Sequence, residues 1–526
     1  MFDILIKHAL VLDGSGRAGQ NLDVALAGGR IAAVDRNIPT EQAGSMLEGR
    51  GLVLAPGFID MHCHTDTYHI ARPDGEIKVR QGVCLDVVGN CGESVAPARN
   101  DQRFQDPTRR EFDEICPGVL TLADYAELLN AARPAIRVMS HVGHSALRIK
   151  VMGHSAASPD TAQMAALVRE TEKAFDQGAA GLSTGLYYAP SGFAGDGELT
   201  ALAQVAARYG RFHASHIRNE GAGLLDSLAE IIRVGRVTQA ASHISHFKVA
   251  GRANWHQAET AVARIESARS QGLDITCDVY PYDRSCTTIL SLIPPWAQED
   301  GMPALAARLE DSQQRKRIVS QMAGGLPGWE NSYQNAGFEG ITISWVASPA
   351  NADLMGLTLA RAAELRGADP FEFVCDLILA EKGAVDIIVA SMDEKLVSRF
   401  LALPYAMIGS DGSPNAGKPH PRVYGTFPRV IRRFVSELGI IPLETAIHKM
   451  TGLPAQRLGL KDQGLIRKGY RADLVLFDPG RFTDTATYSQ PQAYPAGLCS
   501  VMINGEVMLT DETRTAARPG GFVGAG

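Results

Sequence analysis

The chain has 526 residues, 45% of them hydrophobic and 21% charged, so it is long enough for roughly two to four domains with a large core. The net charge of -7 and the lack of basic clusters argue against nucleic acid or an anionic membrane as the partner. Eight cysteines without regular spacing do not indicate a disulfide framework, and they fit the reducing environment of the cytoplasm. No apolar stretch is long enough to cross a bilayer, the N-terminus does not resemble a secretory signal, and the oligomeric state is left open.

The two ends of the chain are both rich in short candidate strands. Gly, Asp and Asn turn signals separate the N-terminal ones, at residues 4–6, 9–12, 23–26 and 31–34. The C-terminal ones lie at 472–477, 500–503 and 507–509, and Asn504-Gly505 between the last two predicts a hairpin turn. Two β-rich ends around a different middle predict one small β domain built from both termini, with residues 1–54 and 456–526.

The middle of the chain, residues 55–455, alternates strand and helix. Candidate strands lie at 53–61, 83–89, 136–141, 179–186, 211–216, 239–246, 274–280 and 406–409. Helical patterns between them include residues 159–177, 198–209, 222–236 and 254–271. This alternation predicts a parallel sheet closed into a (β/α)8 barrel. The segment between residues 282 and 406 is too long for one connection, so we expect an insertion at about 287–344, after the seventh strand.

Two histidines end the first strand of this middle region. An apolar run leads into Gly57-Phe58-Ile59-Asp60-Met61-His62-Cys63-His64. Alternate residues of a strand face the same way, so His62 and His64 can reach one metal ion while Cys63 points away. The pair alone is a moderate signal, since two polar residues in a loop would look the same.

Further residues of metal-ligand type stand at the ends of later candidate strands, where barrel enzymes place their chemistry. Cys91 follows the second strand, His213 and His216 end the fifth, His243 and His246 end the sixth, and Asp411 follows the eighth. Imidazole, thiolate and carboxylate are the ligand types that zinc uses. A lone histidine at a strand end is more often structural, but core packing does not explain this many ligand types at the same ends.

Some of these residues have a second interpretation. His213 and His243 each lie three residues before a candidate ligand, His216 or His246, and we expect them to be buried and hydrogen-bonded rather than ligands. His141 and His144, beside the third strand, are expected to be structural or part of a pocket wall. Cys91 could also be a buried structural thiol or a nucleophile, although a nucleophile needs a neighbouring base and a free sulfur.

An ordered series of motifs carries a resemblance to a known family. The motifs are GFIDMHCH at 57–64, GNCG at 89–92, GLSTGLYYAPSG at 181–192, SHIRNE at 215–220, ISHFK at 244–248, DVYPY at 278–282, GSDG at 409–412 and HPRVYGTFPR at 420–429. Over nearly its whole length the chain resembles the N-acyl-D-amino-acid deacylases (D-aminoacylases) of the amidohydrolase superfamily. The resemblance implies a TIM-like (β/α)8 barrel with a small β-sandwich formed by both termini, which agrees with the predicted elements.

The resemblance also implies a zinc centre. A tightly bound Zn²⁺ is expected on Cys91, His216 and His246, and a second, weaker metal position on His62, His64 and Asp411 with Cys91 as a bridge. Many members of the superfamily use a modified lysine as the bridge, whereas this group uses cysteine. A zinc-bound thiolate is already deprotonated and needs no added carboxyl group.

The same resemblance assigns residues to the substrate. Lys248, Tyr280 and Arg422 match residues that hold the α-carboxylate, and the planar fork of arginine suits a carboxylate. Cys286 falls where relatives place a serine that contacts substrate, so residues 283–286 depart from the family pattern. Tyr188 matches the tyrosine that helps zinc to polarise the scissile carbonyl.

The implied activity is metal-assisted hydrolysis of the amide bond of an N-acyl-D-amino acid, which gives a carboxylate and a free D-amino acid. Asp411 would orient a water that zinc activates, take its proton and return it to the departing amine. A cyclic amide hydrolase, such as a hydantoinase or dihydroorotase, would use the same metal chemistry without the carboxylate clamp. A non-catalytic scaffold is the third interpretation, and it would normally lack some of the ligands.

Overall fold

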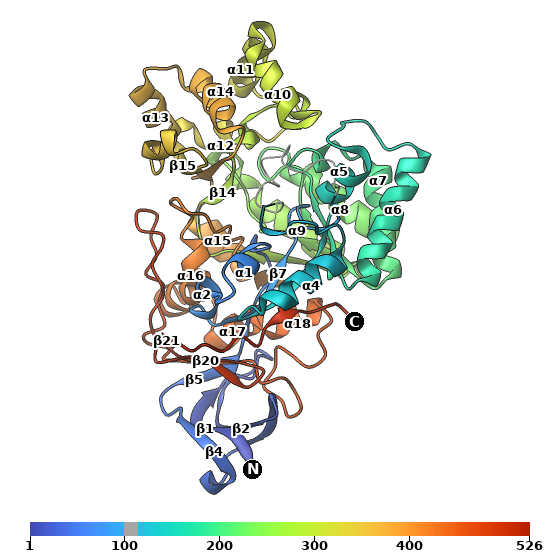
Figure 1. Ribbon diagram of the computed structural model, residues 1–526. Helices are drawn as coiled ribbons and strands as arrows, with labels where there is room; N and C mark the ends of the chain where they lie inside the picture. The colour runs from blue at the N-terminus through green and yellow to red at the C-terminus, as the bar shows by residue number, and fades with distance from the viewer. Residues whose placement is uncertain (99–113) are drawn as a thin grey trace.

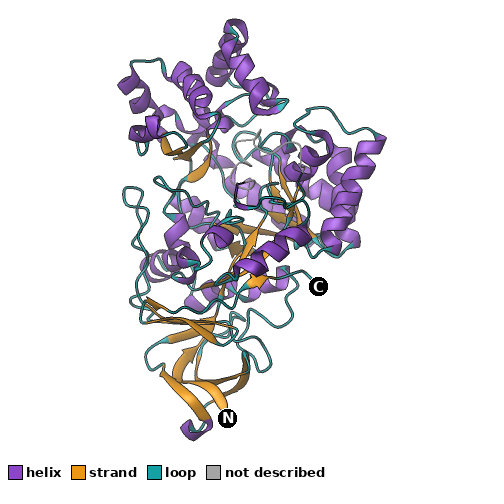
Figure 2. Cartoon of the chain, viewed as in Figure 1, coloured by secondary structure: helices purple, strands orange, loops and turns teal. Residues whose placement is uncertain are grey.

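The computed structural model describes residues 1–98 and 114–526. Figure 1 shows the N-terminal strands at one end of the molecule and a largely helical segment, coloured yellow to orange, at the other. Figure 2 shows that helices surround the strands of the central region, while strands dominate the end that holds the N-terminus. Within the described ranges, none of the helices combines the length and the apolar character needed to cross a bilayer.

Both ends of the chain pair within one nine-stranded sheet. Its path runs β21-β20-β19-β18-β5-β1-β2-β3, and β4 pairs with β1. The N-terminal strands are β1 (Phe2–Val11), β2 (Gln20–Ala27), β3 (Arg30–Asp35), β4 (Ala43–Glu48) and β5 (Val53–Pro56). The C-terminal strands are β18 (Leu474–Phe477), β19 (Leu498–Ile503), β20 (Glu506–Thr510) and β21 (Thr513–Arg514). β18 and β5, which lie more than 400 residues apart in the sequence, are antiparallel neighbours.

Two details of this sheet concern sequence predictions. Residues 4–6 and 9–12 were expected as separate strands, but β1 is one strand with an irregular register between Ile6 and Ala9. His8, at that irregularity, has a φ of 59°, so a bulge rather than a turn absorbs the break in pattern. The Asn504-Gly505 turn between β19 and β20 is confirmed, and both residues have the positive φ that such a two-residue hairpin requires.

The central strands run parallel in two sheets. The first has the order β17-β13-β12-β11-β10-β9, and the second has the order β22-β8-β7-β6. Their bounds are β6 (Phe58–Asp60), β7 (Val83–Val88), β8 (Arg137–Ser140), β9 (Val142–Gly143), β10 (Gly181–Gly185), β11 (Phe212–His216), β12 (Ser242–Ile244), β13 (Ile275–Val279) and β17 (Ala406–Ile408). Backbone hydrogen bonds join the two sheets at both margins, from Met61 N to Ile408 O (3.3 Å) and from Ala180 N to Ser140 O (2.8 Å).

The stretch predicted as one strand at 53–61 is divided at Gly57. Before it, β5 belongs to the terminal sheet, and after it, β6 pairs with β7 of the central region. A Cβ at Gly57 would lie 2.3 Å from the sulfur of Cys84, so only glycine lets the chain pass between the two sheets here. Ala55 and Pro56 still pair with β18, so the terminal sheet extends two residues beyond the predicted boundary at 54.

Helices follow the central strands, and the predicted ones at 159–177, 198–209, 222–236 and 254–271 are confirmed within a few residues. The helix bounds are α1 (Tyr68–Ala71), α2 (Glu76–Val79), α4 (Leu122–Ala132), α5 (His144–Met152), α6 (Thr161–Asp176), α7 (Asp196–Arg208), α8 (Leu224–Thr238), α9 (Ala258–Ser270), α15 (Glu394–Leu401), α16 (Arg422–Arg429), α17 (Leu443–Met450) and α18 (Gly452–Arg457). Asp160 begins α6 with a reciprocal capping box to Gln163, which satisfies backbone groups that the first turn leaves free.

The inserted segment between β13 and β17 has a hydrophobic core of its own. Its strands are β14 (Ser285–Thr288), β15 (Ile341–Val346) and β16 (Val385–Val389), paired in the order β14-β16-β15. Its helices are α10 (Gly301–Glu310), α11 (Ser312–Gly324), α12 (Ser332–Ala336), α13 (Leu359–Arg366) and α14 (Pro370–Glu381). The buried cluster extends from Ile289 to Val389, so this unit continues well past residue 344, where the sequence pattern placed its end.

The C-terminal residues return to the central strands. β22 (Gly521–Phe522) pairs in parallel with β8, and Phe522 N also donates to Asn130 Oδ1 at 2.9 Å. This strand was not predicted, because two residues between glycines carry no periodic signal.

Candidate metal centre and active site

The predicted metal ligands gather at the carboxyl ends of the parallel strands. His62 and His64 follow β6, Cys91 follows β7, His216 ends β11, His246 follows β12 and Asp411 follows β17. His64, Cys91, His216, His246 and Asp411 line a cavity of about 930 Å³, and all six residues except the half-buried His64 are buried. Cys63 points away, as alternation predicts, with its sulfur 3.4 Å from Val87 O.

The sulfur of Cys91 lies at the centre of this arrangement. It is 3.3 Å from His62 Nε2 and 3.4 Å from His246 Nε2. Two overlapping groups of residues are placed so that, within each group, all ligand atoms lie within 4.8 Å of one another. The first group is His62, His64, Cys91 and Asp411, and the second is Cys91, His216 and His246. Cys91 belongs to both groups, so its sulfur is the one atom that the two groups share.

The chemistry of the donors fits a metal ion. Cys91 is an unpaired, buried thiol, and burial raises its pKa well above the usual value, with the nearby Asp411 carboxylate adding to the effect. Both ring nitrogens of His216 are buried without a hydrogen-bond partner within the described protein. A cation among these atoms would favour the thiolate and satisfy the imidazole lone pairs, as nitrogen–sulfur zinc sites do.

The backbone is strained where three of these residues sit. Cys91, His246 and Asp411 have φ values of 53°, 36° and 48°, in the left-handed region that non-glycine residues seldom adopt. Gly409 supports the same site, since a Cβ there would lie 2.6 Å from the Cβ of His62. Strain of this kind is found where the surrounding fold fixes functional groups in one geometry.

A buried carboxylate, Asp278, orients part of the site from below. Its Oδ2 lies 3.2 Å from His62 Nδ1 and 2.9 Å from His243 Nε2, and its Oδ1 accepts from His246 N at 3.0 Å. Burial raises the pKa of Asp278, but His62 and His243 offset this and hold the pKa far below its usual value. A proton on His62 Nδ1 leaves the Nε2 lone pair toward Cys91, which is how carboxylates orient metal-binding histidines.

Glu220 is a second such carboxylate, and the sequence pattern did not single it out. Its Oε1 lies 3.0 Å from His246 Nδ1 and 2.7 Å from Lys248 Nζ, and its Oε2 lies 3.7 Å from His216 Nε2. Burial raises its pKa, whereas Lys248 and the two histidines lower it well below the usual value. The one available signal was its spacing, because Glu220 follows His216 by four residues in SHIRNE.

The structure brings the predicted carboxylate-binding residues to one side of the cavity. Arg422 Nη1 is 2.8 Å from Asp411 Oδ2, and its Nη2 donates to the backbone oxygen of Cys286 at 3.3 Å. The ring of Tyr280 lies 4.7 Å from the guanidinium of Arg422 and 5.7 Å from Lys248 Nζ. The hydroxyl of Tyr280 points to Met392, with 3.8 Å to its sulfur, so Tyr280 meets this cluster through its ring.

Tyr188 lies beside His216. The ring centroids of Tyr188 and His216 are 5.0 Å apart, and those of Tyr187 and His216 are 5.2 Å apart. The Tyr188 hydroxyl is 2.9 Å from Thr287 Oγ1 in the inserted segment. Both tyrosines therefore contact a candidate ligand, and the sequence prediction of Tyr188 alone did not include this role for Tyr187.

The remaining histidines near the site have structural contacts. His144 bridges Ser191 Oγ (2.7 Å) and Glu198 Oε1 (2.8 Å), and His213 Nε2 lies 2.9 Å from Thr184 Oγ1. Burial lowers the pKa of His213 to about 4 and that of His141 to about 3, so both rings are neutral near pH 7. These residues, like His243, support the walls of the site.

A third group of possible ligands, next to the site, already surrounds a lysine ammonium. Asp60, Cys63 and Asp86 have their ligand atoms close together. The ammonium of Lys78 lies among them, 2.5 Å from Asp60 Oδ2 and 3.3 Å from Asp86 Oδ1. This buried amine neutralises the carboxylates, so the cluster is an ion pair beneath the site and not a metal position.

Comparisons with known proteins agree with this geometry. The model of the amidohydrolase family matches residues 49–509. The chain is 36% identical over 505 residues to N-acyl-D-glutamate deacylase from Alcaligenes xylosoxydans xylosoxydans, covering 96% of this chain and 93% of that protein. It is 34% identical over 525 residues to D-aminoacylase from the same organism, covering 99% and 97%.

A solved structure extends the likeness to three dimensions. N-acyl-D-glutamate deacylase from Bordetella bronchiseptica, complexed with zinc and a phosphonate inhibitor that mimics the tetrahedral intermediate, superposes with a TM-score of 0.85. The sequences are 32% identical, and the superposition covers 100% of each chain. With the family model and these relatives all spanning nearly its whole length, the chain belongs to the amidohydrolase family and, within it, to the N-acyl-D-amino-acid deacylases.

Proposed function

We propose that this protein is a zinc-dependent deacylase that hydrolyses the amide bond of N-acyl-D-amino acids to a carboxylate and a free D-amino acid. The observation that carries the proposal is the shared sulfur of Cys91, which joins two ligand groups in one cavity with Lys248 and Arg422. The names of the relatives, which are deacylases of acylated D-amino acids, support the same activity.

The residues fit two metal positions of different strength. Cys91, His216 and His246 would hold the tightly bound zinc, since each is buried and the two histidines have Glu220 behind them. His62, His64 and Asp411 would hold a weaker second metal with Cys91 as the bridge, since His64 is partly exposed and Asp411 is already paired with Arg422. Zinc in such a site supplies Lewis acidity, which lowers the pKa of water and polarises a carbonyl.

The protein's own groups would handle the proton and the substrate. Asp411 accepts the proton of the attacking water and later donates it to the departing amine. Burial raises the pKa of Asp411, but Arg422 and the surrounding histidines lower it well below the usual value, which keeps the carboxylate ionised at neutral pH. Tyr188 donates a hydrogen bond from its hydroxyl to the carbonyl oxygen as negative charge develops there.

Arg422 and Lys248 would fix the α-carboxylate of the substrate. Both are buried cations that line the same cavity as Asp411. Tyr280 packs its ring against both cations, and Cys286 contacts Arg422 through its backbone oxygen. An α-carboxylate held here orients the α-carbon, which would select one hand of the amino acid.

A hydrolysis panel tests the proposed function. Purified enzyme with measured zinc content is offered N-acetyl-D-amino acids, their L-forms and a hydantoin. We expect turnover of the D-forms with zinc bound, and little turnover of the L-forms. Faster opening of the hydantoin would favour a cyclic amide hydrolase, and a protein that binds no zinc would favour a non-catalytic scaffold.

Arg422→Met is expected to lower kcat/KM for an N-acyl-D-amino acid by about 2–4 kcal/mol, because charged hydrogen bonds and alignment are lost. The same substrate made as its neutral amide serves as the comparison, since it has no carboxylate to bind. Arg422 also contacts Asp411, so a smaller loss common to both substrates is expected. Rates on both substrates, with zinc content measured, separate the two contributions.

The control for this variant is Arg433→Met. Arg433 pairs with Glu394 and Glu437 outside the cavity, so its loss should change neither substrate's rate. Equal losses on the acid and the amide in Arg422→Met would mean that Arg422 does not recognise the carboxylate.

Glu220→Gln is expected to weaken zinc binding by about 10–100-fold, because carboxylates that orient metal-binding histidines contribute this much. Glutamine keeps the size of the side chain but lacks the charge that faces His246 and Lys248. Zinc affinity, measured by competition with a chelating dye, is the direct readout. A matched change, Glu394→Gln, removes a carboxylate from an ion pair outside the site and should leave zinc affinity unchanged. Unchanged affinity in Glu220→Gln would limit its role to pairing with Lys248.

We also infer a finer fold and location. Strands β6, β7, β8, β10, β11, β12, β13 and β17 would close into a (β/α)8 barrel, supported by the hydrogen bonds that join the two parallel sheets at both margins. The terminal sheet would fold as a small β-sandwich, with residues 285–389 as the insertion after the seventh strand. We keep the cytoplasm as the proposed compartment, which suits a metal-binding thiol and cysteines that form no disulfides.

A further inference from the structure

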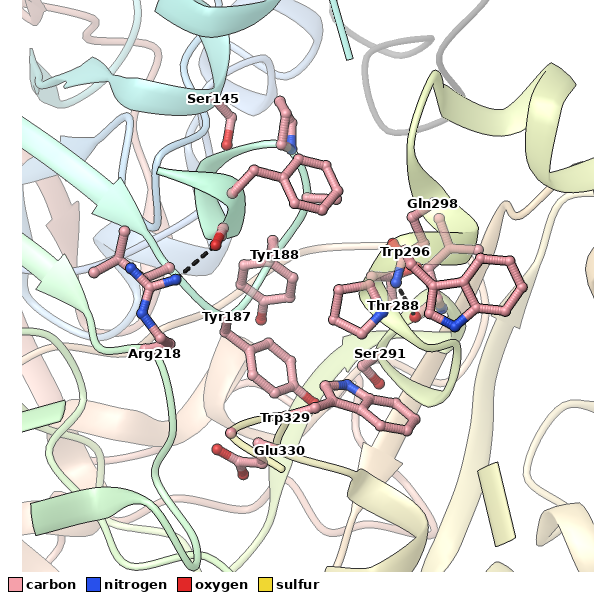
Figure 3. Close-up of a pocket in the computed structure, with 18 of the residues that line it drawn as sticks. Ser145, Tyr187, Tyr188, Arg218, Thr288, Ser291, Trp296, Gln298, Trp329 and Glu330 are labelled. Atoms are coloured by element: carbon pink, nitrogen blue, oxygen red, sulfur yellow. Dashed lines mark hydrogen bonds between the residues drawn. The ribbon is translucent and has the colours of Figure 1, made fainter. Parts of the chain in front are cut away.

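A second chamber of about 420 Å³ adjoins the metal cavity. Glu93, Tyr187, Tyr188, Thr288 and Glu330 belong to the walls of both spaces. Figure 3 shows the two tyrosines between Arg218 on one side and Trp296 of the inserted segment on the other. The chamber is within the size range of cavities that take small-molecule groups, so it is large enough for a substituent of the substrate.

Apolar and aromatic side chains from two parts of the chain form most of this wall. Pro190 and Phe193 come from the loop that follows β10, and Trp296, Leu326 and Trp329 come from the inserted segment. Phe193 and both tryptophans are only partly buried, so part of each aromatic side chain remains exposed. Removing such surface from water is favourable at about 25 cal/mol per Å², so the chamber favours an apolar occupant.

The polar ends of the wall residues are already engaged. Tyr187 places its hydroxyl 2.8 Å from Ser332 Oγ, and Tyr188 uses its own with Thr287. The indole N–H of Trp296 donates to Gln321 Oε1 at 2.6 Å. What these side chains present to the chamber is therefore the apolar part of each ring.

The chamber has no available positive charge among its described residues. Arg218 is the only cation of that wall, and Figure 3 shows its guanidinium hydrogen-bonded to another residue of the wall. It donates to Gly192 O (2.6 Å) and Ala194 O (3.0 Å) and forms two hydrogen bonds to Glu230. An arginine with these partners has little capacity left for a second carboxylate.

Glu330 adds a carboxyl group at the junction of the two spaces. It is buried, and it accepts hydrogen bonds from Glu220 N and from Asn335 Nδ2 (3.0 Å). Burial and the nearby Glu220 carboxylate raise the pKa of Glu330 to about 8, so the cost of an acidic substituent here comes from burying its charge without an available cation among the described residues of the chamber wall, which is unfavourable inside a protein. The junction thus disfavours an acidic substituent.

The chamber is also adjacent to the proposed reaction centre. Both tyrosines of the shared wall lie against the ring of His216, at 5.0 and 5.2 Å between centroids. The α-carboxylate side, with Arg422, belongs to the larger cavity and not to the chamber. A group that enters the chamber is therefore attached close to the scissile bond, either as the side chain or as the acyl chain.

Building on the proposed function, we propose that the preferred substrate carries a large apolar group that occupies this chamber, and that a second carboxylate is rejected. The relatives named for glutamate and aspartate would then differ from this enzyme in substrate choice. Two kinds of substrate would place a large apolar group next to the amide. One has an aromatic or branched side chain, and the other has a long acyl chain.

The test compares kcat/KM of the zinc-loaded enzyme on four kinds of substrate. N-acetyl-D-alanine is small at both positions, N-acetyl-D-phenylalanine is large at the side chain, N-octanoyl-D-alanine is large at the acyl group, and N-acetyl-D-glutamate is acidic. We expect one or both apolar substrates to exceed N-acetyl-D-alanine by about 10–100-fold, the value of burying one large apolar group. The apolar substrate with the higher kcat/KM identifies whether the side chain or the acyl chain enters the chamber. The kcat/KM for N-acetyl-D-glutamate should be lower than that for N-acetyl-D-alanine.

Two variants locate the preference. Trp296→Ala and Trp329→Ala should each reduce the ratio of the favoured apolar substrate to N-acetyl-D-alanine by about 3–10-fold, since each removes part of an aromatic wall. Leu365→Ala, at a half-exposed residue of α13 in the same inserted segment, should leave that ratio unchanged. Zinc content and melting temperature are measured for each variant, and a ratio rather than a rate is compared, so partial unfolding does not imitate the result.

The outcomes separate this inference from the proposed function. If N-acetyl-D-alanine or N-acetyl-D-glutamate is hydrolysed and neither apolar substrate gains, the chamber proposal is overturned while the deacylase remains. The same holds if N-acetyl-D-glutamate is the best substrate, or if both tryptophan variants keep the wild-type ratio. If zinc is bound and no N-acyl-D-amino acid is hydrolysed, the proposed function itself fails.

Discussion

Cys91→Ala is expected to lose the tightly bound zinc and to lower turnover by about 10³-fold or more. The sulfur is the one atom common to both ligand groups, so its removal breaks each of them. Alanine leaves His216 and His246 as a two-nitrogen site, which is too few ligands for a stable zinc centre. A metal centre contributes several kcal/mol to the transition state, and each 1.36 kcal/mol is a factor of ten in rate. Metal analysis of the purified protein and kcat on one N-acyl-D-amino acid are the two measurements.

Cys277→Ala is the matched control for this change. Cys277 is also a fully buried thiol, but it lies in β13 and packs in the hydrophobic core. Its loss should lower stability slightly and leave zinc content and kcat near those of the wild type. A Cys91→Ala protein that retains one zinc per chain and normal turnover would show that the sulfur is not a ligand.

Asp411→Asn is expected to lower kcat by about 10²–10⁴-fold while zinc stays bound at Cys91, His216 and His246. Asparagine can neither accept the proton of the attacking water nor return one to the amine, and general acid–base catalysis contributes this much. The side chain keeps its size, so its strained position after β17 should be preserved. Zinc content, melting temperature and kcat measured on the same preparation test the prediction.

Asp484→Asn provides the comparison for Asp411. Asp484 is likewise buried and paired with arginine, through Arg429 and Arg432, but it does not line either cavity. The Asp484→Asn variant should keep kcat within a factor of about two of the wild type, since no catalytic proton passes through Asp484. Turnover of Asp411→Asn close to that of the wild type would remove Asp411 from the proton-transfer step.

Much of the site was predictable because strand ends can be found in the sequence. His62 and His64 follow β6, and Cys63 between them faces the other way, as an alternation of two residues predicts. The positions of Cys91, His216 and Asp411 followed from apolar strand patterns that end just before them. Placing these ends together required only the parallel arrangement of the strands.

The partners of the ligands were not predictable in the same way. Asp278 contacts His62 across 216 residues of sequence, and Glu220 contacts Lys248 from a neighbouring strand end. A carboxylate one strand away leaves no mark on local periodicity, so only the folded arrangement identifies it. The same limit explains Tyr187, whose contact with His216 depends on how the loop after β10 turns.

The predicted boundaries of strands were wrong where one continuous apolar run pairs with different strands along its length. The run at 53–61 looks like one strand in the sequence because its apolar pattern does not change at Gly57. The division comes from pairing, with β18 on one side of that glycine and β7 on the other. The inserted segment was likewise underestimated, because β16 resembles any buried strand until its pairing with β14 and β15 is known.

The joining of both chain ends in one sheet affects how the protein is made. During synthesis β5 leaves the ribosome early, but its antiparallel neighbour β18 is translated more than 400 residues later. Until then one edge of β5 lacks its partner, and exposed strand edges of this kind favour aggregation. β22 then adds to β8 from the last residues of the chain. A product of translation that stops before β18 and β22 would therefore leave both sheets unfinished, which marks it for chaperones and proteases.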